Sequence, residues 1–438
     1  MAFFSKVTKT LWGDLSRDEY KKFGLLALTF LFIIGTYWLM RPLKDSLFGS
    51  IVGIEWQPRA KMLSFLCIIP LIMIYSKLVD LFDKQKLFYF VTIFYSAFFL
   101  IIAFLLMHPA IGLGNPIASP KRILGWVIYV SIESFGSLVV ALFWSYVAST
   151  TEAASAKRGY ALIISGAQFG SIMGPTLGSF ATTIGTAPLM FVVSLGILIS
   201  PLMIKLFTTI IPENLRTTHY AQIKSAATGP LEGIKLLLTR PYLLGIFGVA
   251  TLYEVVGTIM DYQMKVLAFK QYLTPDSRTA FLSLFGQSAN TLALVFALIG
   301  TSYFMRKFGL TFCLVMFPVT VGLVVTYVYI NPVLWVVFGA MIAVKGLSYA
   351  LNNPSKEVMY IPTSKDIKFK AKSWIDAFGG RSAKATGSAV TDFFRGAPAS
   401  LMFYGTLISL GIVGLWIFVA FAVGNAFNKL QKEDKVVS

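Results

Sequence analysis

Arg381 and Lys384 are two basic side chains in the stretch of residues 368–392, which we interpret as a helix within a membrane. Arg381 and Lys384 are three positions apart, which places them on about the same side of a helix. Within hydrocarbon a cation costs roughly 2.5–3.5 kcal/mol on insertion scales, and basic residues at such depths are usually functional. We therefore expect these side chains to line a pathway for an anionic solute.

Small residues recur at four-residue spacing beside these cations, at Gly379, Ala383, Gly387 and Thr391. A second ladder with the same spacing occurs earlier, at Gly166, Gly170, Gly174 and Gly178. Such ladders let a neighbouring helix approach closely. Because the two superpose at one constant offset, they predict an internal repeat. On that register the two cations correspond to Gln168 and Ser171, so the first half is polar where the second is charged.

A second basic pair ends the first apolar run, in the stretch YWLMRPLKDSLFGS. Tyr37, Arg41 and Lys44 recur at i, i+4 and i+7 and share one helical face. We expect Lys44 to contact the anion. Arg41 has two interpretations, which are substrate binding and snorkelling to the membrane interface.

Carboxylates complete the set of candidate residues. Glu133 has apolar neighbours on both sides, so it needs a cation partner or a proton. Glu254, Asp261 and Lys265 lie at i, i+7 and i+11, one stripe of a helix, and the last two can pair locally. This stripe either contacts the solute or only stabilises the bundle.

Lys345 lies in an otherwise apolar run and is a further candidate for substrate binding. Five further lysines are expected to be loop charges on the inner side, namely Lys356, Lys365, Lys368, Lys370 and Lys372. Lys356 is also close enough to the helix end to reach a bound phosphate. Several aromatic residues could stack on a base: Tyr37, Phe143, Trp144 and Tyr253.

These residues belong to a membrane protein. Of its 438 residues 56% are hydrophobic and 13% are charged, and the mean hydropathy is +0.73. Repeated apolar runs of about 20 residues indicate transmembrane helices. We expect the first run to be a retained helix rather than a secretory signal, because no small-residue cleavage site follows it. The expected helices are 23–48, 60–76, 87–107, 123–148, 157–180, 186–210, 242–270, 279–303, 309–329, 332–353, 371–394 and 400–427.

The net charge of +18 is explained by basic loops on one side of the membrane rather than by nucleic-acid binding. With an even number of spans and a basic, amphipathic lead over residues 1–22, the positive-inside rule places both termini in the cytoplasm. The cytoplasmic loop 211–240 separates two six-helix bundles, 1–210 and 241–438, the second with a cytoplasmic tail. The predicted fold class is therefore an all-α membrane protein.

The sequence gives little support for disulfide bonds, metal or haem sites, or enzymatic catalysis. Cys67 and Cys313 are single residues in apolar runs, and His108 and His219 fall in expected loops, so we predict no disulfide framework, metal site or haem. A Walker loop and a His- or Cys-based catalytic set are both missing, which argues against ATP hydrolysis and against an enzyme. We expect no cofactor.

The candidate residues resemble the nucleotide transporter family, the ATP/ADP translocases of plastids and obligate intracellular bacteria. The resemblance lies in RPLKDSLF (41–48), in YVSIESFGSLVVALFW (129–144) with the following TEAASAKRGYALIISGAQFG, in YEVVGTIMDYQMK (253–265) and in the inner segment from 356 to 388. That segment, with KE-x-x-YIP, K-x-K-x-K and I-D-x-x-x-x-R-x-x-K, is the most specific.

The resemblance implies a major-facilitator-like fold with twelve helices in a 6+6 pseudo-twofold arrangement around a central cavity. It also implies exchange of ADP for ATP, and it assigns functional roles to Lys44, Glu133, Glu254, Arg381 and Lys384. The chain departs from the family pattern at Ser134-Phe135 and in VVGTIMDYQMK, and these differences bear on substrate and coupling.

We therefore expect a monomeric nucleotide transporter of a bacterial inner membrane that exchanges ATP and ADP by alternating access. Substrate would contact Lys44, Arg41, Lys265, Arg381, Lys384 and Lys345, while Glu133, Glu254 and Asp261 would serve coupling or ion pairing. One alternative is proton-driven import of another nucleotide, NAD or another anionic solute. Another is a membrane receptor without transport.

Overall fold

The computed structural model describes residues 15–216, 237–299, 302–364, 371–372, 374–433 and 435–437. Three expectations therefore fall wholly or partly outside the described residues. They concern the first 14 residues of the amphipathic lead, most of the loop 211–240, and the three loop lysines at 365, 368 and 370.

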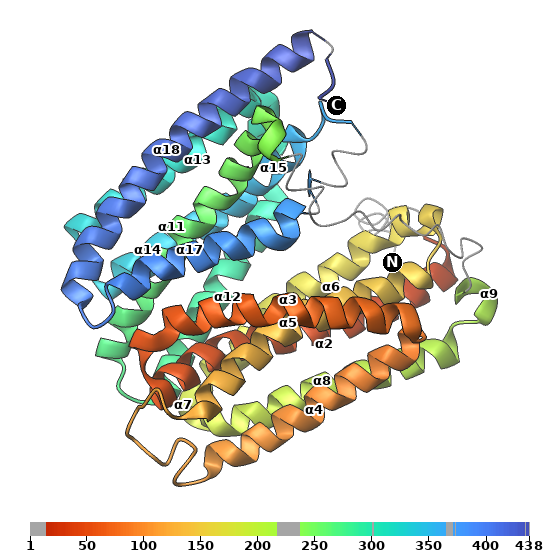
Figure 1. Cartoon of the computed structure of the whole chain (residues 1–438). Helices are drawn as coiled ribbons and strands as arrows, with labels where there is room; N and C mark the ends of the chain where they lie inside the picture. The colour runs from red at the N-terminus through yellow and green to blue at the C-terminus, as the bar shows by residue number, and fades with distance from the viewer. Residues whose placement is uncertain are drawn as a thin grey trace. The chain divides into compact units, whose positions relative to one another are not determined.

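The described chain is almost entirely helical (Figure 1). Helices suit a hydrocarbon environment because they satisfy every backbone polar group within one segment. The first half contains α2 (Arg17–Phe48), η1 (Gly49–Gly53), η2 (Ile54–Trp56), α3 (Gln57–Leu81), α4 (Lys84–Met107), α5 (Ile123–Ser149), α6 (Ala153–Ser179), α7 (Ala181–Ile184), α8 (Thr186–Ile210) and α9 (Glu213–Arg216). The second half contains α11 (Pro241–Gln271), α12 (Pro275–Ile299), α13 (Ser302–Ile330), α14 (Leu334–Leu347), η3 (Ser348–Asn352), α15 (Asn353–Met359), η4 (Ile375–Gly379), α17 (Gly380–Phe393) and α18 (Pro398–Lys432).

Every range predicted to be helical overlaps an observed helix. Within the described residues, nine helical segments are long and apolar enough to cross a membrane. Helices α2 and α3 count there as one segment, Arg17–Leu81, because the short turns η1 and η2 join them. Helix α6 is not among the nine because it is rich in small and polar residues, and α17, with 14 residues, is too short. The protein is a multi-pass membrane protein, and the count of twelve spans stays a prediction.

The chain forms two compact units. The first comprises 1–53, 66–223 and 272–287, and the second comprises 54–65, 224–271 and 288–438. The start of α3 therefore belongs to the second unit, and the start of α12 belongs to the first.

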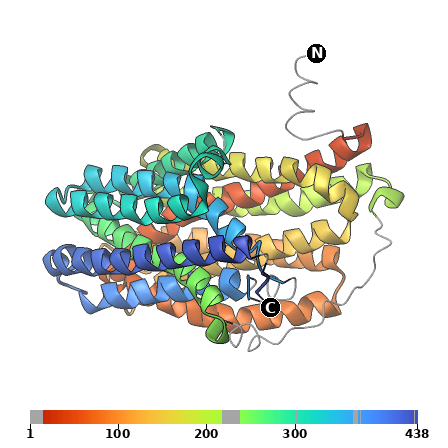
Figure 2. The ribbon, with the colours of Figure 1, turned by 90° about the horizontal axis from the view of Figure 1, so that it is seen from above.

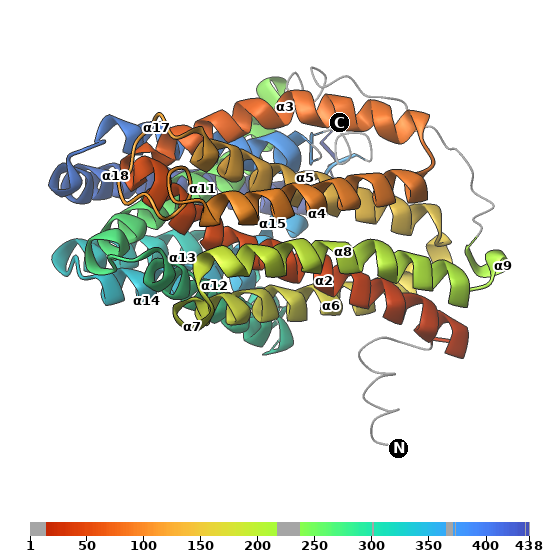
Figure 3. The ribbon, with the colours of Figure 1, turned by 90° about the horizontal axis from the view of Figure 1, so that it is seen from below.

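In the first unit α2 packs along α6 and also contacts α5 and α8, while α4 packs on α8 (Figure 3).

Polar contacts stabilise the start of α2. Ser16 and Glu19 form a capping box. The buried Lys22 ammonium donates to the carbonyl oxygens of Thr150 at 2.6 Å and Leu215 at 2.7 Å, at the ends of α5 and α9. A cation is favourable there because helix C-termini carry partial negative charge.

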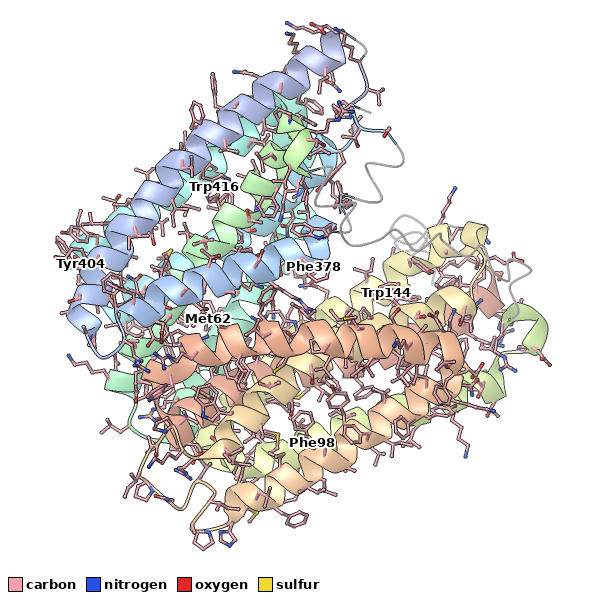
Figure 4. The ribbon with its side chains drawn as sticks, in the orientation of Figure 1. Met62, Phe98, Trp144, Phe378, Tyr404 and Trp416 are labelled. Atoms are coloured by element: carbon pink, nitrogen blue, oxygen red, sulfur yellow. The ribbon has the colours of Figure 1, made fainter. Side chains whose placement is uncertain are left out.

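In the second unit α11 packs against α14, α17 and α18, and α13 packs against α14 and α18. Helix α18, dark blue in Figure 2, is a single helix of 35 residues. Its fully buried Trp416, labelled in Figure 4, lies inside this unit. The Trp416 ring contacts the rings of Phe317 and Tyr253. The unit therefore has an aromatic core beside the helix that carries Glu254.

Candidate functional site

The glycine ladder of α6 lies directly against the backbone of α2. A Cβ atom placed on Gly166, Gly170 or Gly174 would lie 2.3, 2.4 or 2.0 Å from a carbonyl oxygen of α2. Such distances leave no room for any side chain, so glycine is required for this approach. The close helix contact that the sequence predicts is confirmed, and it holds α2 in a defined position.

The second ladder packs α17 on α11 in the same manner but less tightly. A Cβ on Gly387 would lie 2.9 Å from both the Val255 oxygen and the Thr258 Cβ. A Cβ on Gly379 would meet side-chain atoms of α11 at 3.3 Å. Ala383 and Thr391, between and beyond these glycines, are buried. The two ladders thus act on corresponding helix pairs, α6 on α2 and α17 on α11.

Lys44 is an almost completely buried cation of the first unit, with 4% of its surface exposed. Its Nζ atom donates to the Glu133 carboxylate of α5 and lies 3.8 Å from Asp45. The ammonium also lies 4.4 Å from the centre of the Tyr129 ring, a cation–π contact. A buried charge needs such partners, and α5 and α2 together supply them to Lys44.

The Glu133 side chain is less enclosed than its partner, with 30% exposure against 6% for Lys44. The carboxylate is therefore the side of the pair that an incoming group can approach. Asp45 is a second buried carboxylate in this cluster, and the sequence analysis did not single it out. Its position directly after Lys44 is the signal that would have identified it.

Tyr37 and Arg41 lie on the turns of α2 that precede Lys44. The Tyr37 ring lies against Gly136 of α5, where a Cβ would come within 2.3 Å of the ring. The Arg41 guanidinium lies 4.5 Å from the Trp38 ring centre. Arg41 therefore contacts an aromatic ring of its own helix, and a role in substrate binding stays a prediction.

The second unit has its own buried cation. Lys265 is 5% exposed, and its Nζ atom lies 2.6 Å from Asp261 on the preceding turn of α11. This confirms the local pair that the spacing predicts. Lys61 of α3 reaches the same carboxylate at 3.3 Å, and Lys345 of α14 acts on it electrostatically. Asp261 is thus shared among lysines from three helices.

Glu254 lies two turns earlier on α11 and faces a second group of cations. The Lys384 ammonium of α17 is 3.5 Å from its carboxylate, and Lys356 of α15 lies within electrostatic range of both. Lys384 is 52% exposed and Glu254 is 29% exposed. Arg381, one turn before Lys384, is half-buried. Glu254 and Asp261 are seven residues apart. Because seven residues of α-helix rise about 10 Å, the two groups are separated by about 10 Å along α11.

The predicted site residues therefore fall into three clusters, one around Lys44 in the first unit and two along α11 in the second. Lys61, like Asp45, is a residue that sequence reasoning missed. It stands just inside the start of α3, where a cation resembles an ordinary loop charge. Its distance of 200 positions from Asp261 hides the pairing from any local pattern. A single chamber shared by all these cations stays a prediction.

The aromatic candidates for base stacking fit less well. The Phe143 ring is fully buried and stacked on Phe30, with centroids 4.5 Å apart and planes at 7°. The prediction for Phe143 is wrong because helix packing uses its face. Trp144 contacts Phe30 and Phe143 edge-on, and Tyr253 belongs to the aromatic core around Trp416.

A groove of about 520 Å³ in the second unit lies away from these clusters. It is bounded by α13 and α14, and the described residues that line it include no charged side chain: Thr320, Leu323, Val324, Tyr327, Trp335, Val336, Gly339, Ala340 and Ala343. An apolar lining offers nothing to a phosphate, so this groove is not the candidate site.

Comparisons with solved structures agree with the fold. A bacterial homologue of the iron transporter ferroportin in an inward-facing state superposes with a TM-score of 0.66 at 14% identity, over 94% of this chain and 99% of that chain. The POT family transporter PepTSo gives 0.63 at 10% identity, over 95% and 99%. At such identities the likeness concerns the fold alone, which is that of major-facilitator-like transporters.

Sequence comparisons identify the family. The chain is 26% identical over 480 residues to "ADP,ATP carrier protein 2, chloroplastic" of Arabidopsis thaliana, covering 95% of this chain and 76% of the relative. It is 24% identical over 495 residues to "ADP,ATP carrier protein 1" of Rickettsia typhi, covering 99% and 98%. The family description "TLC ATP/ADP transporter" matches residues 1–427. The chain therefore belongs to the TLC ATP/ADP transporter family.

Proposed function

We propose that this protein is a nucleotide transporter that exchanges ATP and ADP across a bacterial inner membrane. The observation that carries the proposal is the family match over residues 1–427, together with relatives named ADP,ATP carriers along nearly the whole chain. The members of such a family move solutes rather than catalyse reactions, so the protein is not an enzyme.

The charged clusters support this function chemically. Lys44 is paired with Glu133, and Lys384 with Glu254, so each cation is neutralised by a carboxylate of its own unit. A phosphate group is also a strong acceptor for ammonium and guanidinium donors and can replace a carboxylate. Nucleotide phosphates would contact Lys44, Arg381 and Lys384, while Glu133 and Glu254 would be released.

The finer architecture belongs to the same proposal. Twelve spans would form two six-helix bundles, 1–210 and 241–438, related by a pseudo-twofold axis, with the loop 211–240 and both termini in the cytoplasm. The matched ladders of α6 and α17 support this repeat, because each packs its helix on the first helix of its own half. Transport would proceed by alternating access, and the working unit would be a monomer.

A second candidate function is proton-driven import of another nucleotide, NAD or another anionic solute. The partial exposure of Glu133 and Glu254 favours it, because a carboxylate that can leave its lysine can also take up a proton. In that case uptake would collapse when the pH gradient is dissipated and would not need nucleotide inside the vesicle.

The deciding experiment is counter-exchange in reconstituted vesicles. Vesicles loaded with ADP should take up labelled ATP, and vesicles without internal nucleotide should not. Lys44→Ala and Arg381→Ala should each reduce the initial rate at least 100-fold, because each removes a cation that the phosphates need. Size-exclusion chromatography checks that both variants fold. Wild-type uptake from both variants would reject these site residues, and wild-type vesicles without exchange would reject the function.

A further inference from the structure

The membrane span that follows α13 contains an irregular turn. Helices α14 and α15 belong to one apolar stretch, Leu334–Met359, and the π-helical turn η3 (Ser348–Asn352) lies between them. Such turns are rare and are frequently found at functional sites. Asn352 ends the turn, and Ser355 and Lys356 follow it at i+3 and i+4. These three polar side chains therefore share one face of the span.

Two of the three side chains are buried polar groups without a protein partner. Asn352 is 3% exposed and Ser355 is 0% exposed. Within the described ranges of the chain, neither the Asn352 Nδ2 atom nor the Ser355 Oγ atom has a hydrogen-bond partner. Ser348, at the start of the same turn, differs because its side chain is hydrogen-bonded to Tyr253 of α11. Unpaired buried donors cost stability and are rare in native structures, so their retention here indicates a partner from outside the chain.

Lys356 determines the charge of that partner. Helix α15 packs against α11, and Lys356 lies within electrostatic range of Glu254 and Lys384. Glu357 and Asp376 also act on Lys356, so carboxylates of the second unit compensate its charge. An ammonium beside an amide and a hydroxyl repels a metal cation and favours an anion with several acceptor oxygens, such as a phosphate group.

We propose that Asn352, Ser355 and Lys356 form a subsite for one phosphate group of the transported nucleotide. The amide and the hydroxyl donate to phosphate oxygens, while the ammonium selects the sign of the ligand. The inference rests on the proposed function, because it takes the phosphate group from the transported nucleotide. It assigns to Asn352 and Ser355 a role that the sequence pattern does not indicate.

A binding role and a structural role of these donors predict different effects on stability. Ser355→Ala and Asn352→Leu each replace an unpaired buried donor by an apolar group of similar size, so the ligand-free protein should not lose stability. Each substitution also removes one donor to phosphate, so anion binding should weaken. Groups that only hold a buried water would give the reverse pattern, because their loss destabilises the fold and leaves anion binding unchanged.

Two neighbouring residues supply matched controls. Asn353 is the adjacent amide, one position further around the helix and half-buried. Lys372 is a nearby cation with its own partners, because it is paired with Glu357 and lies 5.6 Å from the centre of the Tyr360 ring. Asn353→Leu and Lys372→Ala therefore remove an amide and a cation from the same region and leave the three donors in place. Lys356→Arg is a third control because it keeps the charge.

The experiment measures thermal melting of the purified full-length protein in dodecyl maltoside micelles with increasing pyrophosphate. The half-saturating concentration should rise about tenfold in Ser355→Ala and in Asn352→Leu, which corresponds to about 1.4 kcal/mol of binding free energy for each donor. Asn353→Leu and Lys372→Ala should stay within about twofold of the wild type, and Lys356→Arg within about threefold. Without ligand, the first two variants should melt at the wild-type temperature or up to about 2 °C above it. Size-exclusion chromatography establishes that each variant is folded.

A lipid headgroup also carries a phosphate, so a parallel titration adds phosphatidylglycerol to the same micelles. Stabilisation by the lipid should be equal in the wild type, Ser355→Ala and Asn352→Leu, because the subsite is assigned to the nucleotide. A loss of lipid stabilisation in these variants would assign the three donors to the membrane instead and would overturn the proposal.

Three results together would support the subsite: weaker pyrophosphate binding in both variants, ligand-free melting temperatures that are not lowered, and unchanged stabilisation by lipid. Any other combination would overturn it, as would a wild-type protein that pyrophosphate does not stabilise. Failure of the proposed function is recognised separately, as wild-type vesicles without ATP/ADP exchange. In that case the pyrophosphate titration would still decide whether the anion subsite exists.

Discussion

Two helix pairs of this protein pack through small residues at the same four-residue spacing, but one pair packs more closely than the other. In the first unit the glycines of α6 meet backbone oxygens of α2, with Cβ distances of 2.0–2.4 Å at Gly166, Gly170 and Gly174. In the second unit the ladder of α17 contains an alanine and a threonine, and its glycines leave 2.9–3.3 Å. The backbones of the first pair therefore approach each other more closely than those of the second, in which side chains of α11 also line the contact.

The exposed fractions of the cations on these helices differ in the same direction, since the more tightly packed helix carries the more buried cation. Lys44, on the tightly packed α2, is 6% exposed in its side chain, whereas Lys384, on the loosely packed α17, is 52% exposed. A buried cation depends on its partner far more than a solvated one does. The comparison teaches that α2 of the first unit holds Lys44 by packing, while α17 of the second unit leaves Lys384 accessible.

The largest expected effect comes from removing the carboxylates of the two pairs. Glu133→Gln leaves the buried Lys44 without its main partner and should lower the free energy of unfolding by about 3 kcal/mol. Glu254→Gln leaves Lys384 in contact with solvent and should cost less than about 1 kcal/mol. Unfolding in mixed micelles with increasing dodecyl sulfate measures both. Equal losses would show that the two clusters are equally buried.

Substitution of the ladder glycines tests the packing directly. Gly174→Ala places a methyl group 2.0 Å from the Gly35 oxygen, so α6 must move away from α2, at a cost of about 2–3 kcal/mol. Gly387→Ala meets its neighbours at 2.9 Å and should cost about 1 kcal/mol. The same unfolding titration gives both values. A larger loss of unfolding free energy for Gly387→Ala than for Gly174→Ala would show that α17 and α11, rather than α6 and α2, are the more tightly packed pair.

The smallest effect concerns the polar contacts at the starts of α2 and α11. Lys22→Met keeps the apolar stem but leaves the carbonyls of Thr150 and Leu215 without their donor, at about 1–2 kcal/mol. Tyr242→Phe removes one bond to the Met359 oxygen, 2.7 Å long, at about 1 kcal/mol. Thermal melting of the purified variants ranks them. Should Tyr242→Phe prove the more damaging, the start of α11 would be held more firmly than that of α2.

Much of this organisation was readable from local patterns. Apolar runs identified the helices because a chain in hydrocarbon must satisfy its own backbone. The four-residue spacing identified the ladders, and the i, i+4 spacing identified the Asp261–Lys265 pair. Isolated charges such as Lys44 and Glu133 stood out because they are expensive within a membrane, and the motifs around them were sufficient to indicate the family.

The tertiary structure alone decided which charges that are distant in sequence meet. Glu133 pairs with Lys44 from 89 positions away, and Asp261 takes a second partner, Lys61, from 200 positions away. It also decided that the Phe143 face is used by Phe30 and that α6 packs more tightly than α17. Local spacing determines which face of a helix a residue occupies, but its neighbours depend on how helices distant in sequence pack together.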